Sequence, residues 1–468
     1  MSRLRLYNTR TRRKEVFEPL EAGHARIYTC GPTVYSPQHI GNLRPNLFAD
    51  LLKRALLAEG LRVTLVINIT DVGHLTDDVD SGEDKMELAA KRSGRSALDI
   101  SREYTEQWLR DRRLVGCLPP EVLCKATEHI PEQIEMIRTL EGKGYTYRIT
   151  DGIYFDTSKF PRYADFARLD LSAQQEGVRI GDVAGKRNPA DFALWKLTAP
   201  GVKRQQEWDS PWGRGFPGWH IECSAMSTKY LGTRFDIHTG GVEHVGVHHT
   251  NEIAQSECAL DVHPWVQVWM HEDWIVFQGE KIAKSKGNVY LLQDLMDRGW
   301  LPLSFRFFFL QAHYRKQQNF NTAAMAAADR GYRRLLAQVE PLREVANATD
   351  AGAGQELRER FLEAVADDLS APRALAVAQE TVRRHDLAPG VRRALIEEFD
   401  AWLGLDLLSA PLPELEQESD PDVDARVAQR EVARAARDFA EADRIRDELA
   451  DQGVRIEDTA SGPRWRRR

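Results

Sequence analysis

The spacing of apolar residues near the start of the chain predicts a strand, a helix and a second strand. Residues 26–30 have the composition of a strand. Residues 46–59 place apolar side chains at helical spacing, and Gly60 follows them as a stop signal. Residues 61–68 are rich in β-branched side chains and lack Gly and Pro. Elements of these lengths form a βαβ unit, so we expect a parallel sheet.

The pattern changes several times further along the chain. Residues 97–115 and 127–142 are amphipathic, and a hairpin is expected around Asp151-Gly152. Residues 176–217 are rich in Gly, Pro, Trp and charge, which predicts a loop-heavy insertion. A strand at 234–238, a Gly-Gly turn and a helix near 247–260 resume the α/β pattern.

These changes predict an α/β fold with several parts: a Rossmann-type parallel-sheet domain with an insertion, a helical domain, and a small C-terminal unit. From residue 323 onward Ala, Leu, Arg and Glu dominate, while residues 409–422 are rich in Pro and acids, as in a linker. In the last unit we expect one long helix, a short strand and a basic end. The expected boundaries are 1–118 and 216–262 for the two halves of the parallel-sheet domain, 119–215 for the insertion, 263–322 for a linking region, 323–408 for the helical domain, 409–422 for the linker and 423–468 for the C-terminal unit.

The composition is that of an ordinary globular protein. Of 468 residues, 42% are apolar and 29% are charged, which excludes a mostly disordered, collagen-like or coiled-coil chain. No apolar run approaches the roughly 18 residues that a membrane helix needs. The first residues lack the apolar core of a secretory signal. We therefore expect a cytoplasmic protein without a membrane partner.

The charge and the cysteine content limit the kinds of function that we expect for this chain. The net charge of −7 opposes a passive nucleic-acid binder, but it allows an enzyme with a local basic groove. The five cysteines are odd in number and widely spaced, so a disulfide framework is not expected. This indicates that the protein resides in a reducing compartment. One or two of the cysteines are candidate metal ligands.

The tetrapeptide that starts at His39 lies in the loop between the first strand and the first helix. Ligands of doubly wound sheets bind at this place, and a helix N-terminus there attracts phosphate. His39 can donate to a phosphate oxygen, and Gly41 lets a bulky group approach the backbone. By itself, such a tetrapeptide is more often an ordinary turn.

Lys281 and Lys284 form a second candidate, a basic loop completed by Ser285 and Gly287. Such a loop can neutralise the charge that develops when pyrophosphate leaves, although alone it is more often a solvated turn. The two loops occur together, about 240 residues apart. A His-x-Gly-x loop followed by a Lys-x-x-Lys-Ser loop resembles the two-part signature of class I aminoacyl-tRNA synthetases.

A third group of residues has the chemistry of a metal site. His248 and Glu252 are four residues apart, so they share one face of the expected helix. Cys30 ends the first strand, and Cys223 precedes another apparent helix. Two sulfurs, one nitrogen and one oxygen are ligands that zinc accepts. The spacing is not that of a zinc finger, and buried free cysteines are common, so a structural role stays open.

Long motifs of this chain resemble those of cysteinyl-tRNA synthetases, in the same order from about residue 5 to residue 468. One of them is Gly218-Trp219-His220-Ile221-Glu222-Cys223. The resembling segments are residues 28–35, 39–42, 68–71, 186–189, 191–196, 218–226, 235–238, 248–256, 313–315 and 462–467.

The resemblance implies a cysteine–tRNA ligase. Such an enzyme activates L-cysteine with ATP, releases pyrophosphate and transfers cysteine to the 3′ end of its tRNA. The parallel-sheet domain is then catalytic, and the C-terminal unit recognises the anticodon. The implied partners are tRNA, ATP with Mg²⁺, and L-cysteine, and a monomer is expected.

The resemblance also implies roles for individual residues. One zinc per chain would select the substrate thiolate, because an apolar pocket separates cysteine from the near-isosteric serine poorly. The implied residues are Cys30, Cys223, His248 and Glu252 for zinc; His39, Asn42, Lys281, Lys284 and Ser285 for catalysis; Gly41, His238 and Lys284 for ATP or adenylate; Thr33, Thr70, Trp219 and Glu243 for cysteine; and Arg426, Arg430, Arg434, Trp465 and Arg466 for tRNA.

The tRNA contacts are expected in two places. Arg426, Arg430, Arg434 and Arg437 predict a basic stripe along one helix face, although Glu431 and other nearby acids allow a salt-bridged face instead. Among the C-terminal arginines, Trp465 is expected to stack on an unpaired base.

Three positions depart from the family pattern and keep alternatives open. Asn42 stands for a second histidine, Ala283 for a serine, and Glu243 for an aspartate. One alternative is the related ligase that joins cysteine to an amino-sugar, which residues 423–468 oppose. The other is a catalytically silent paralogue that binds RNA or zinc, which the full ligand set, His39 and both lysines oppose.

Overall fold

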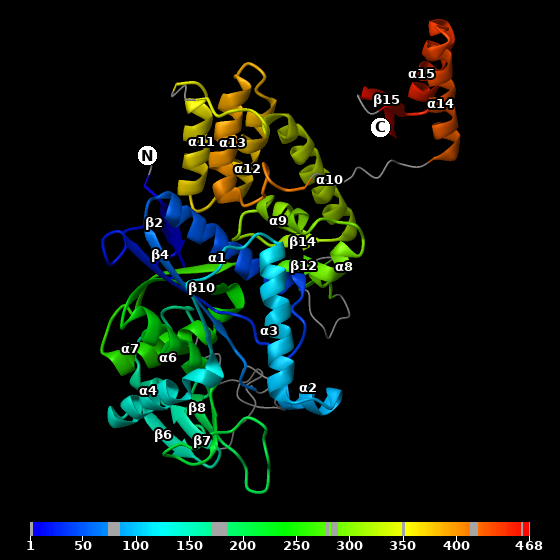
Figure 1. The fold of residues 1–468 in the computed structure, drawn as a ribbon. Helices are drawn as coiled ribbons and strands as arrows, with labels where there is room; N and C mark the ends of the chain where they lie inside the picture. Colours follow the sequence, from blue (N-terminus) through cyan, green and yellow to red (C-terminus); the bar gives the residue numbers. More distant parts are fainter. Residues whose placement is uncertain are drawn as a thin grey trace. The chain divides into compact units, whose positions relative to one another are not determined.

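The computed structural model describes residues 3–73, 85–169, 185–277, 280–281, 289–348, 352–411, 420–459 and 462–467. The chain divides into two compact units, Met1–Ala410 and Pro411–Arg468. Figure 1 shows the order of the helices and strands in each unit. Within the described ranges, no helix has both the length and the apolar character needed to cross a membrane.

A five-stranded parallel sheet organises the larger unit. The strand order is β11-β10-β3-β4-β5, and every neighbouring pair is parallel. In this doubly wound arrangement ligands bind where the strand order reverses, here between β3 and β10. The strands are β3 (His24–Thr29), β4 (Arg62–Ile69), β5 (Val122–Lys125), β10 (Phe235–Gly241) and β11 (Val266–Glu272).

The expected βαβ unit is present as β3, α1 (Ile40–Ala58) and β4. The apolar face of α1 is fully buried, with Leu43, Leu47 and Leu51 among its core residues. Two further helices matter for the site: α6 (Trp219–Leu231) and α7 (His248–Leu260), which pack against each other and against α4 (Ile130–Gly142).

The expected insertion contains a second sheet. Its strands are antiparallel, in the order β6-β7-β8-β9, and β6 with β7 is the expected hairpin. Strands β8 and β9 lie within the segment expected to be loop-heavy, and β5, expected in the insertion, belongs to the central sheet. The bounds are Thr146–Ile149 for β6, Gly152–Phe155 for β7, Phe192–Leu197 for β8 and Gly215–Pro217 for β9.

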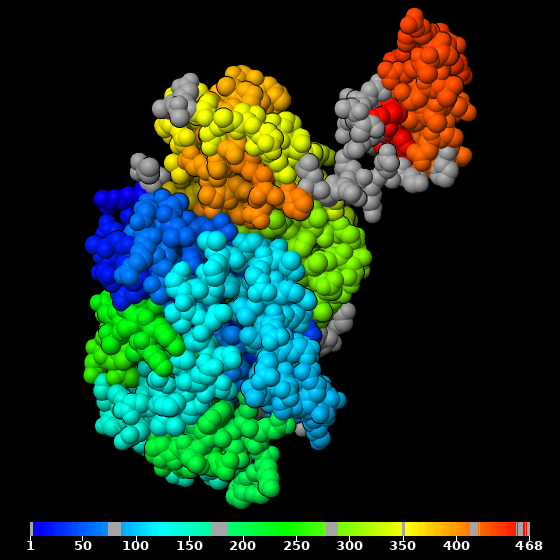
Figure 2. All heavy atoms as spheres, in the orientation of Figure 1, coloured from blue at the N-terminus to red at the C-terminus, as the bar shows by residue number. Residues whose placement is uncertain are grey.

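The helical region expected after residue 323 is present, and Arg306 of the preceding helix α9 (Pro302–Leu310) links it to the sheet domain. Arg306 lies 2.6 Å from Asp50 of α1, and its Nε donates to the backbone oxygen of Leu403. The helical region and the insertion lie at opposite ends of the larger unit, with the central sheet between them (Figures 1 and 2). The helices here are α8 (Leu292–Met296), α9 (Pro302–Leu310), α10 (Thr322–Val339), α11 (Gln355–Ala366), α12 (Ala371–Arg383) and α13 (Pro389–Leu403).

The remaining elements of the larger unit are short or peripheral. They are β1 (Arg5–Asn8), β2 (Arg13–Val16), α2 (Lys85–Ser93), α3 (Ala97–Leu114), β12 (Ile275–Phe277), β13 (Glu280–Lys281), β14 (Gln318–Phe320) and the 3-10 turns η1 (Ala126–His129), η2 (Thr157–Lys159), η3 (Val242–His244) and η5 (Glu340–Leu342).

The C-terminal unit has two helices where one long helix was expected. They are α14 (Pro421–Ala435) and α15 (Phe439–Asp451), and a hairpin of β15 (Val454–Thr459) and β16 (Gly462–Arg467) follows. Arg437 between the helices has a φ of 61°, which a continuing helix cannot accommodate. The Asp438 side chain then accepts from the backbone of Glu441 and starts α15.

Candidate functional site

The first side chains of the site follow β3 at the carboxyl edge of the central sheet. Cys30 comes directly after this strand. The next residue, Gly31, has no room for a side chain, since a Cβ there would lie 1.6 Å from the backbone oxygen of Asn68. Its amide donates to Asn68 Oδ1 at 2.9 Å. This close approach holds Cys30 against the end of β4.

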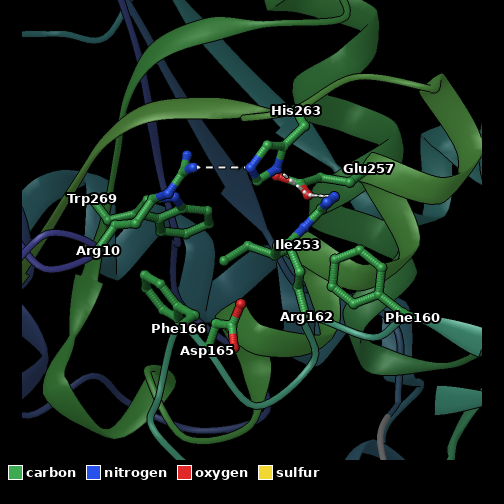
Figure 3. A pocket seen from close by; sticks show the side chains of 9 residues that line it. All are labelled: Arg10, Phe160, Arg162, Asp165, Phe166, Ile253, Glu257, His263 and Trp269. Atoms are coloured by element: carbon green, nitrogen blue, oxygen red, sulfur yellow. Dashed lines mark hydrogen bonds and ion pairs between the residues drawn. The ribbon is translucent and has the colours of Figure 1, made fainter. Parts of the chain in front are cut away.

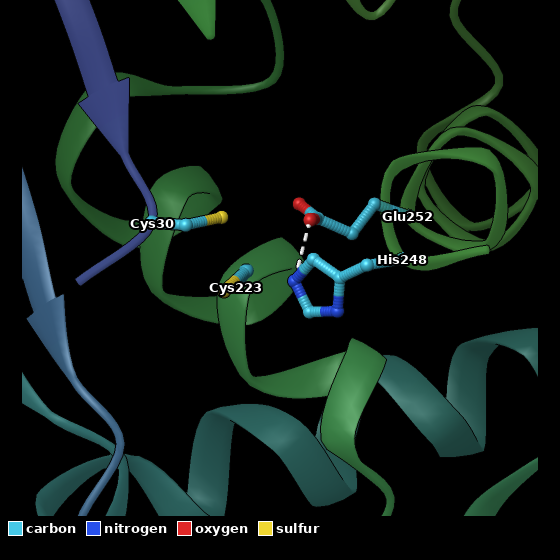
Figure 4. A group of neighbouring side chains, drawn as sticks. All are labelled: Cys30, Cys223, His248 and Glu252. Carbon is cyan, nitrogen blue, oxygen red and sulfur yellow. Dashed lines mark ion pairs between the residues drawn. The ribbon is translucent and has the colours of Figure 1, made fainter. Parts of the chain in front are cut away.

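The structure brings the four implied zinc ligands together. Cys223 lies on α6, while His248 and Glu252 project from one face of α7 toward Cys30 (Figure 4). The ligand atoms of all four lie within 4.8 Å of one another. Two sulfurs, one imidazole and one carboxylate make a donor set that zinc accepts. The residues therefore fit a zinc ion.

Several titratable groups of this cluster are buried close together and shift one another's pKa. A hydrogen bond from Cys30 lowers the pKa of the Cys223 thiol to about 7, although burial acts in the opposite direction. Burial also opposes the charge of Glu252, but His238 and His248 lower its pKa to about 2. Against its own burial, His248 has a pKa raised to about 10 by Glu252 and Cys223. In the absence of a metal, the protonated His248 thus balances the charge of Glu252 in this buried place.

Further histidines orient the metal-donor side chains of this cluster. Two of them, His220 and His249, were not identified from the sequence. His220 Nδ1 lies 3.0 Å from His248 Nδ1, and His249 Nε2 lies 3.4 Å from Cys30 Sγ. Both histidines are next to expected site residues in the 218–226 and 248–256 motifs, which is the signal that could have identified them. Partners of this kind fix the orientation of metal ligands.

His238, which the resemblance assigns to ATP or adenylate, has a contact within the cluster. Its side chain is fully buried, and its Nε2 lies 3.0 Å from Glu252 Oε2. The structure therefore gives His238 a contact that positions Glu252. A second donor group consists of Cys30, His238, His249 and Glu252, so it shares two side chains with the first.

The side chains expected to bind cysteine surround this cluster. The ring centroid of the half-buried Trp219 lies 4.3 Å from that of His248. Thr33 and Thr70 form an isolated bridge close to Cys30, and Thr70 Oγ1 accepts from Asn68 at 3.0 Å. Glu243 follows β10, and its carboxylate accepts the indole N–H of Trp274 at 2.5 Å.

The described residues that follow the lysine loop contact the start of α1. His39 is the N-cap of α1 and forms a backbone bridge with Leu291, and the Ile40 amide donates to the Tyr290 oxygen at 2.8 Å. Leu291 follows the lysine loop by a few residues. Lys284 and Ser285 themselves lie outside the described residues, and Lys281 is described only as backbone of β13. The ends of both loops are thus joined at the start of α1.

Asn42, which stands in place of the second histidine of the family pattern, has a structural contact at the start of α1. Its Oδ1 accepts from the His39 amide at 3.2 Å, which completes a capping box at the start of α1. Two amides of the first turn, those of Ile40 and Asn42, donate to the backbone oxygens of Tyr290 and His39, and the Gly41 amide between them is the one suited to an anion. The loop therefore retains the phosphate-binding character of a helix N-terminus.

The expected arginine stripe is a salt-bridged face, the alternative that the sequence had left open. Arg426 pairs with Glu448 at 2.6 Å. Arg434 pairs with Glu431 at 3.3 Å, and Arg430, only 8% exposed, pairs with the same glutamate at 2.6 Å.

Trp465 is a core residue, which corrects the expectation that it stacks on a base. It is 8% exposed, packs in the hydrophobic core of the C-terminal unit and donates its indole N–H to Asp424 at 2.7 Å. Arg466 lies on β16, and its side chain is outside the described part of the chain. The large aromatic side chain that this unit exposes is Phe439, at 62%.

Glu272, which no sequence pattern singled out, is a buried acid at the end of β11. Burial, assisted by the nearby Glu243, raises its pKa to about 8, although Arg44 acts in the opposite direction. Two adjacent acids, Glu272 and Asp273, after an apolar strand are the signal that could have identified it. The carboxyl group therefore keeps its proton in the folded protein over much of the neutral range.

We expect Glu272→Gln to stabilise the protein increasingly as the pH rises from about 4.5 to about 8. In this window the folded protein keeps the Glu272 proton and the unfolded chain loses it, so folding stability falls by about 1.4 kcal/mol per pH unit. Glutamine removes this loss. Melting temperatures of the unmodified protein and of Glu272→Gln at pH 5 and pH 8 measure this difference in stability. The surface variant Glu106→Gln is the control. A melting-temperature difference that does not grow with pH would contradict the prediction.

Comparison with known proteins gives a consistent result over nearly the whole chain. The family model described as tRNA synthetases class I (C) catalytic domain matches residues 16–330. The chain is 46% identical to "Cysteine--tRNA ligase 1" of Burkholderia lata, over 98% of this chain and 96% of the relative. It is 40% identical to "Cysteine--tRNA ligase" of Thermus thermophilus, over 98% of each chain.

Solved structures share the fold at low sequence identity. The Mycobacterium tuberculosis methionyl-tRNA synthetase with methionyl-adenylate matches with a TM-score of 0.53 at 14% identity, over 82% of this chain and 88% of that chain. The LeuRS–tRNA–LeuAMS complex of Agrobacterium radiobacter matches with a TM-score of 0.58 at 12% identity, over 84% and 86%. These similarities agree with the doubly wound sheet and the following helices.

Proposed function

Because the chain belongs to the cysteinyl-tRNA synthetase family of class I enzymes, we propose that it joins L-cysteine to its tRNA with ATP as the energy source. The observation that carries this proposal is the buried cluster of Cys30, Cys223, His248 and Glu252 at the edge of the sheet where ligands bind. The joined ends of the two signature loops support it. We further infer a cytoplasmic protein, since all five cysteines are free, as in a reducing compartment. The monomer remains what the family resemblance implies.

The reaction has two steps. A carboxylate oxygen of cysteine attacks the α-phosphorus of ATP, and the bond to the β-phosphate oxygen breaks with departure of pyrophosphate. A ribose hydroxyl at the 3′ end of tRNA then attacks the acyl carbon of cysteinyl-adenylate, loses its proton, and AMP leaves. Neither step needs a protein nucleophile, so positioning and charge stabilisation account for catalysis.

The residues of the two loops would stabilise the phosphates. His39 and Asn42, with the Gly41 amide in the first turn of α1, are suited to the triphosphate. Lys281 and Lys284, with Ser285 beside them, are suited to the leaving pyrophosphate, together with the Mg²⁺ that accompanies ATP. The backbone bonds between residues 39–40 and 290–291 support this division, because they hold the end of the lysine loop at the phosphate site.

The cluster would hold one zinc ion through Cys30, Cys223, His248 and Glu252. When bound, zinc supplies a preference for a thiolate over a hydroxyl, which separates cysteine from serine. The protein residues position the rest of the amino acid. Trp219 lies against His248 and lines one side of this space, and Thr33 with Thr70 lies near Cys30. The Glu243 carboxylate is suited to the substrate ammonium group.

Two assays test the proposed function. In pyrophosphate exchange with each of the twenty amino acids, only cysteine should support exchange. Aminoacylation of total tRNA should then label cysteine tRNA alone. Exchange without tRNA charging would favour the amino-sugar ligase, and absence of exchange with a zinc-loaded enzyme would favour the silent paralogue.

We expect Lys284→Ala to slow pyrophosphate exchange by about a hundredfold to a thousandfold, or about 2.7–4 kcal/mol, as for loss of one oxyanion donor. The positive charge stabilises the leaving pyrophosphate more than it stabilises bound ATP. The exchange rate at saturating cysteine and ATP measures this effect. The matched control is Lys91→Ala, which removes an exposed lysine from α2. An unchanged rate in Lys284→Ala would remove this lysine from the catalytic set.

We also expect Phe439→Ala to weaken tRNA charging by about tenfold or more, because stacking of a base on an aromatic ring contributes about 1–3 kcal/mol. Phe439 replaces Trp465 as the candidate stacking residue, since it is exposed at the start of α15. The ratio kcat/KM for tRNA is the quantity to measure. Val432→Ala, which removes another exposed apolar side chain of this unit, should have little effect. Equal effects of both changes would contradict a stacking role.

A further inference from the structure

A row of hydrogen bonds connects the end of β1 with the metal-site cluster. Thr9 Oγ1 lies 2.7 Å from His271 Nδ1, and His271 Nε2 lies 2.8 Å from His249 Nδ1. His249 Nε2 in turn lies 3.4 Å from Cys30 Sγ. Three elements meet here, because Thr9 follows β1 directly, His271 lies on β11 and His249 lies on α7. We call these three side chains the hydrogen-bonded row.

The hydrogen-bonded row is fixed by its surroundings. Each of its three side chains is at most 4% exposed. The Thr9 amide donates to the backbone oxygen of Trp269 at 2.7 Å, which ties the segment after β1 to β11. The ring of His249 lies against Gly240, where a Cβ would be only 2.7 Å from its Cε1. Any residue other than glycine at position 240 would therefore displace this ring.

The Cys30 sulfur decides the direction of the three bonds. Burial favours uncharged imidazole rings, in which one nitrogen donates and the other accepts. A cysteine that binds a metal ion is a thiolate, which can only accept. His249 Nε2 then donates to the sulfur, so its Nδ1 accepts from His271 Nε2. His271 Nδ1 accepts in turn, and the Thr9 hydroxyl is the donor at the far end of the row.

We propose that Thr9 and His271 are positioning residues of the metal site, which act through His249 to keep a hydrogen-bond donor directed at the Cys30 sulfur. The inference rests on the zinc ion of the proposed function, since Cys30 is one of its four expected ligands. A donor to a thiolate makes a charge-assisted bond and fixes the orientation of the ligand. The sequence pattern assigned no role to Thr9 or His271.

Arg10, the next residue after Thr9, offers a local comparison. Its guanidinium contacts His263 Nε2 at 3.3 Å. Figure 3 shows that Arg10 and Trp269 are among the side chains around a cavity of about 200 Å³. A change at Arg10 therefore disturbs the same segment without removing a member of the hydrogen-bonded row.

The zinc affinity of the full chain, measured by competition with a chelator, tests the proposal. Loss of an outer partner of a metal ligand costs about 10–100-fold in affinity. Thr9→Val removes the hydroxyl but keeps the shape of the side chain, and it should weaken zinc binding about tenfold. His271→Leu removes the central donor and should weaken binding by about 10–100-fold.

Conservative variants separate the hydrogen bonds from the packing. Thr9→Ser keeps a hydroxyl, and His271→Gln keeps an N–H donor near the place of Nε2, so both should retain the zinc affinity of the unmodified protein. Arg10→Gln should retain it as well. The matched threonine is Thr381, which is buried in α12 and donates to the Val377 oxygen. Thr381→Val should lower the melting temperature without changing zinc affinity.

The absorption spectrum of the cobalt(II)-loaded protein gives a readout that a loss of stability alone does not change. A hydrogen bond to a thiolate stabilises its electrons, so loss of the bond should shift the sulfur-to-cobalt charge-transfer band to longer wavelength. We expect this shift in Thr9→Val and not in Thr9→Ser or Thr381→Val. If His271→Leu does not fold, Thr9→Val, which differs by one hydroxyl, carries the test.

Three results would overturn the proposal: equal zinc affinities of Thr9→Val and Thr381→Val, an unchanged cobalt band in Thr9→Val, or a Thr9→Ser variant as weak as Thr9→Val. Each of them leaves the proposed zinc site intact. If the unmodified chain binds neither metal ion, the proposal fails together with the zinc part of the proposed function. The pyrophosphate exchange assay then decides separately on the ligase activity.

Discussion

Replacing Cys223 with alanine is expected to remove the bound zinc and to lower cysteine-dependent pyrophosphate exchange by at least about a hundredfold. Cys223 supplies one of two sulfurs among four buried donors that lie within 4.8 Å of one another. Outer partners of metal ligands alone change affinity by about 10–100-fold, so a direct ligand should have the larger effect. Metal content after purification and the exchange rate measure the two consequences.

The matched control is Cys258→Ala. Cys258 is also buried, and it lies on the same helix, α7, as His248 and Glu252, but it belongs to neither donor group. This variant should keep its zinc and its exchange rate. X-ray absorption gives an independent test, with two sulfur neighbours of zinc expected without cysteine and three with it. A Cys223 variant with full zinc, or an unchanged sulfur count, would contradict the assignment.

The first βαβ unit could be predicted because its pattern is local. Helical spacing over residues 46–59 and the β-branched run before Asn68 each identify one element without help from the rest of the chain. The short strands β8 and β9 could not, because Gly, Pro and Trp dominate their surroundings. The position of β5 in the central sheet depends on pairing with β4, which no local pattern reveals.

The candidate metal site shows the same division between local and distant information. The spacing of His248 and Glu252 predicts that they share a helix face, and α7 confirms this. Nothing local connects them with Cys30 or Cys223, so the residues alone left a structural role open. The family resemblance connected them, and the fold of β3, α6 and α7 brings them together.

The C-terminal unit shows where local reasoning gave a wrong result. An aromatic residue among terminal arginines suggests exposure, but Trp465 pairs with Ile456 across the β15–β16 hairpin, which places it in the core. Arg430 lies in the same helix as the core residues Val423 and Val427 and is almost as buried. Burial in this unit depends on how its hairpin folds against its helices, and the sequence pattern does not show that.

Removal of all residues from Pro411 onward is expected to leave the rate of cysteine activation close to that of the full chain. The same truncation should lower kcat/KM for tRNA by at least about a hundredfold. The reason is the division of the chain. The smaller unit begins at Pro411 and has its own core around Val427, Ile445 and Trp465, so the larger unit keeps its separate core when the smaller one is removed. All expected residues for cysteine, zinc and ATP lie before that point.

The truncated protein also tests where tRNA recognition resides. Its melting temperature and its cysteine-dependent exchange rate establish that the larger unit is folded and active. Charging of cysteine tRNA over a range of tRNA concentrations then isolates the loss of RNA contacts, and Phe439→Ala in the full chain should show part of that loss. If the truncated enzyme charges tRNA as efficiently as the full chain, the unit from Pro411 onward does not recognise the anticodon. Recognition would then belong to the helical region of α10–α13, which the truncated chain retains.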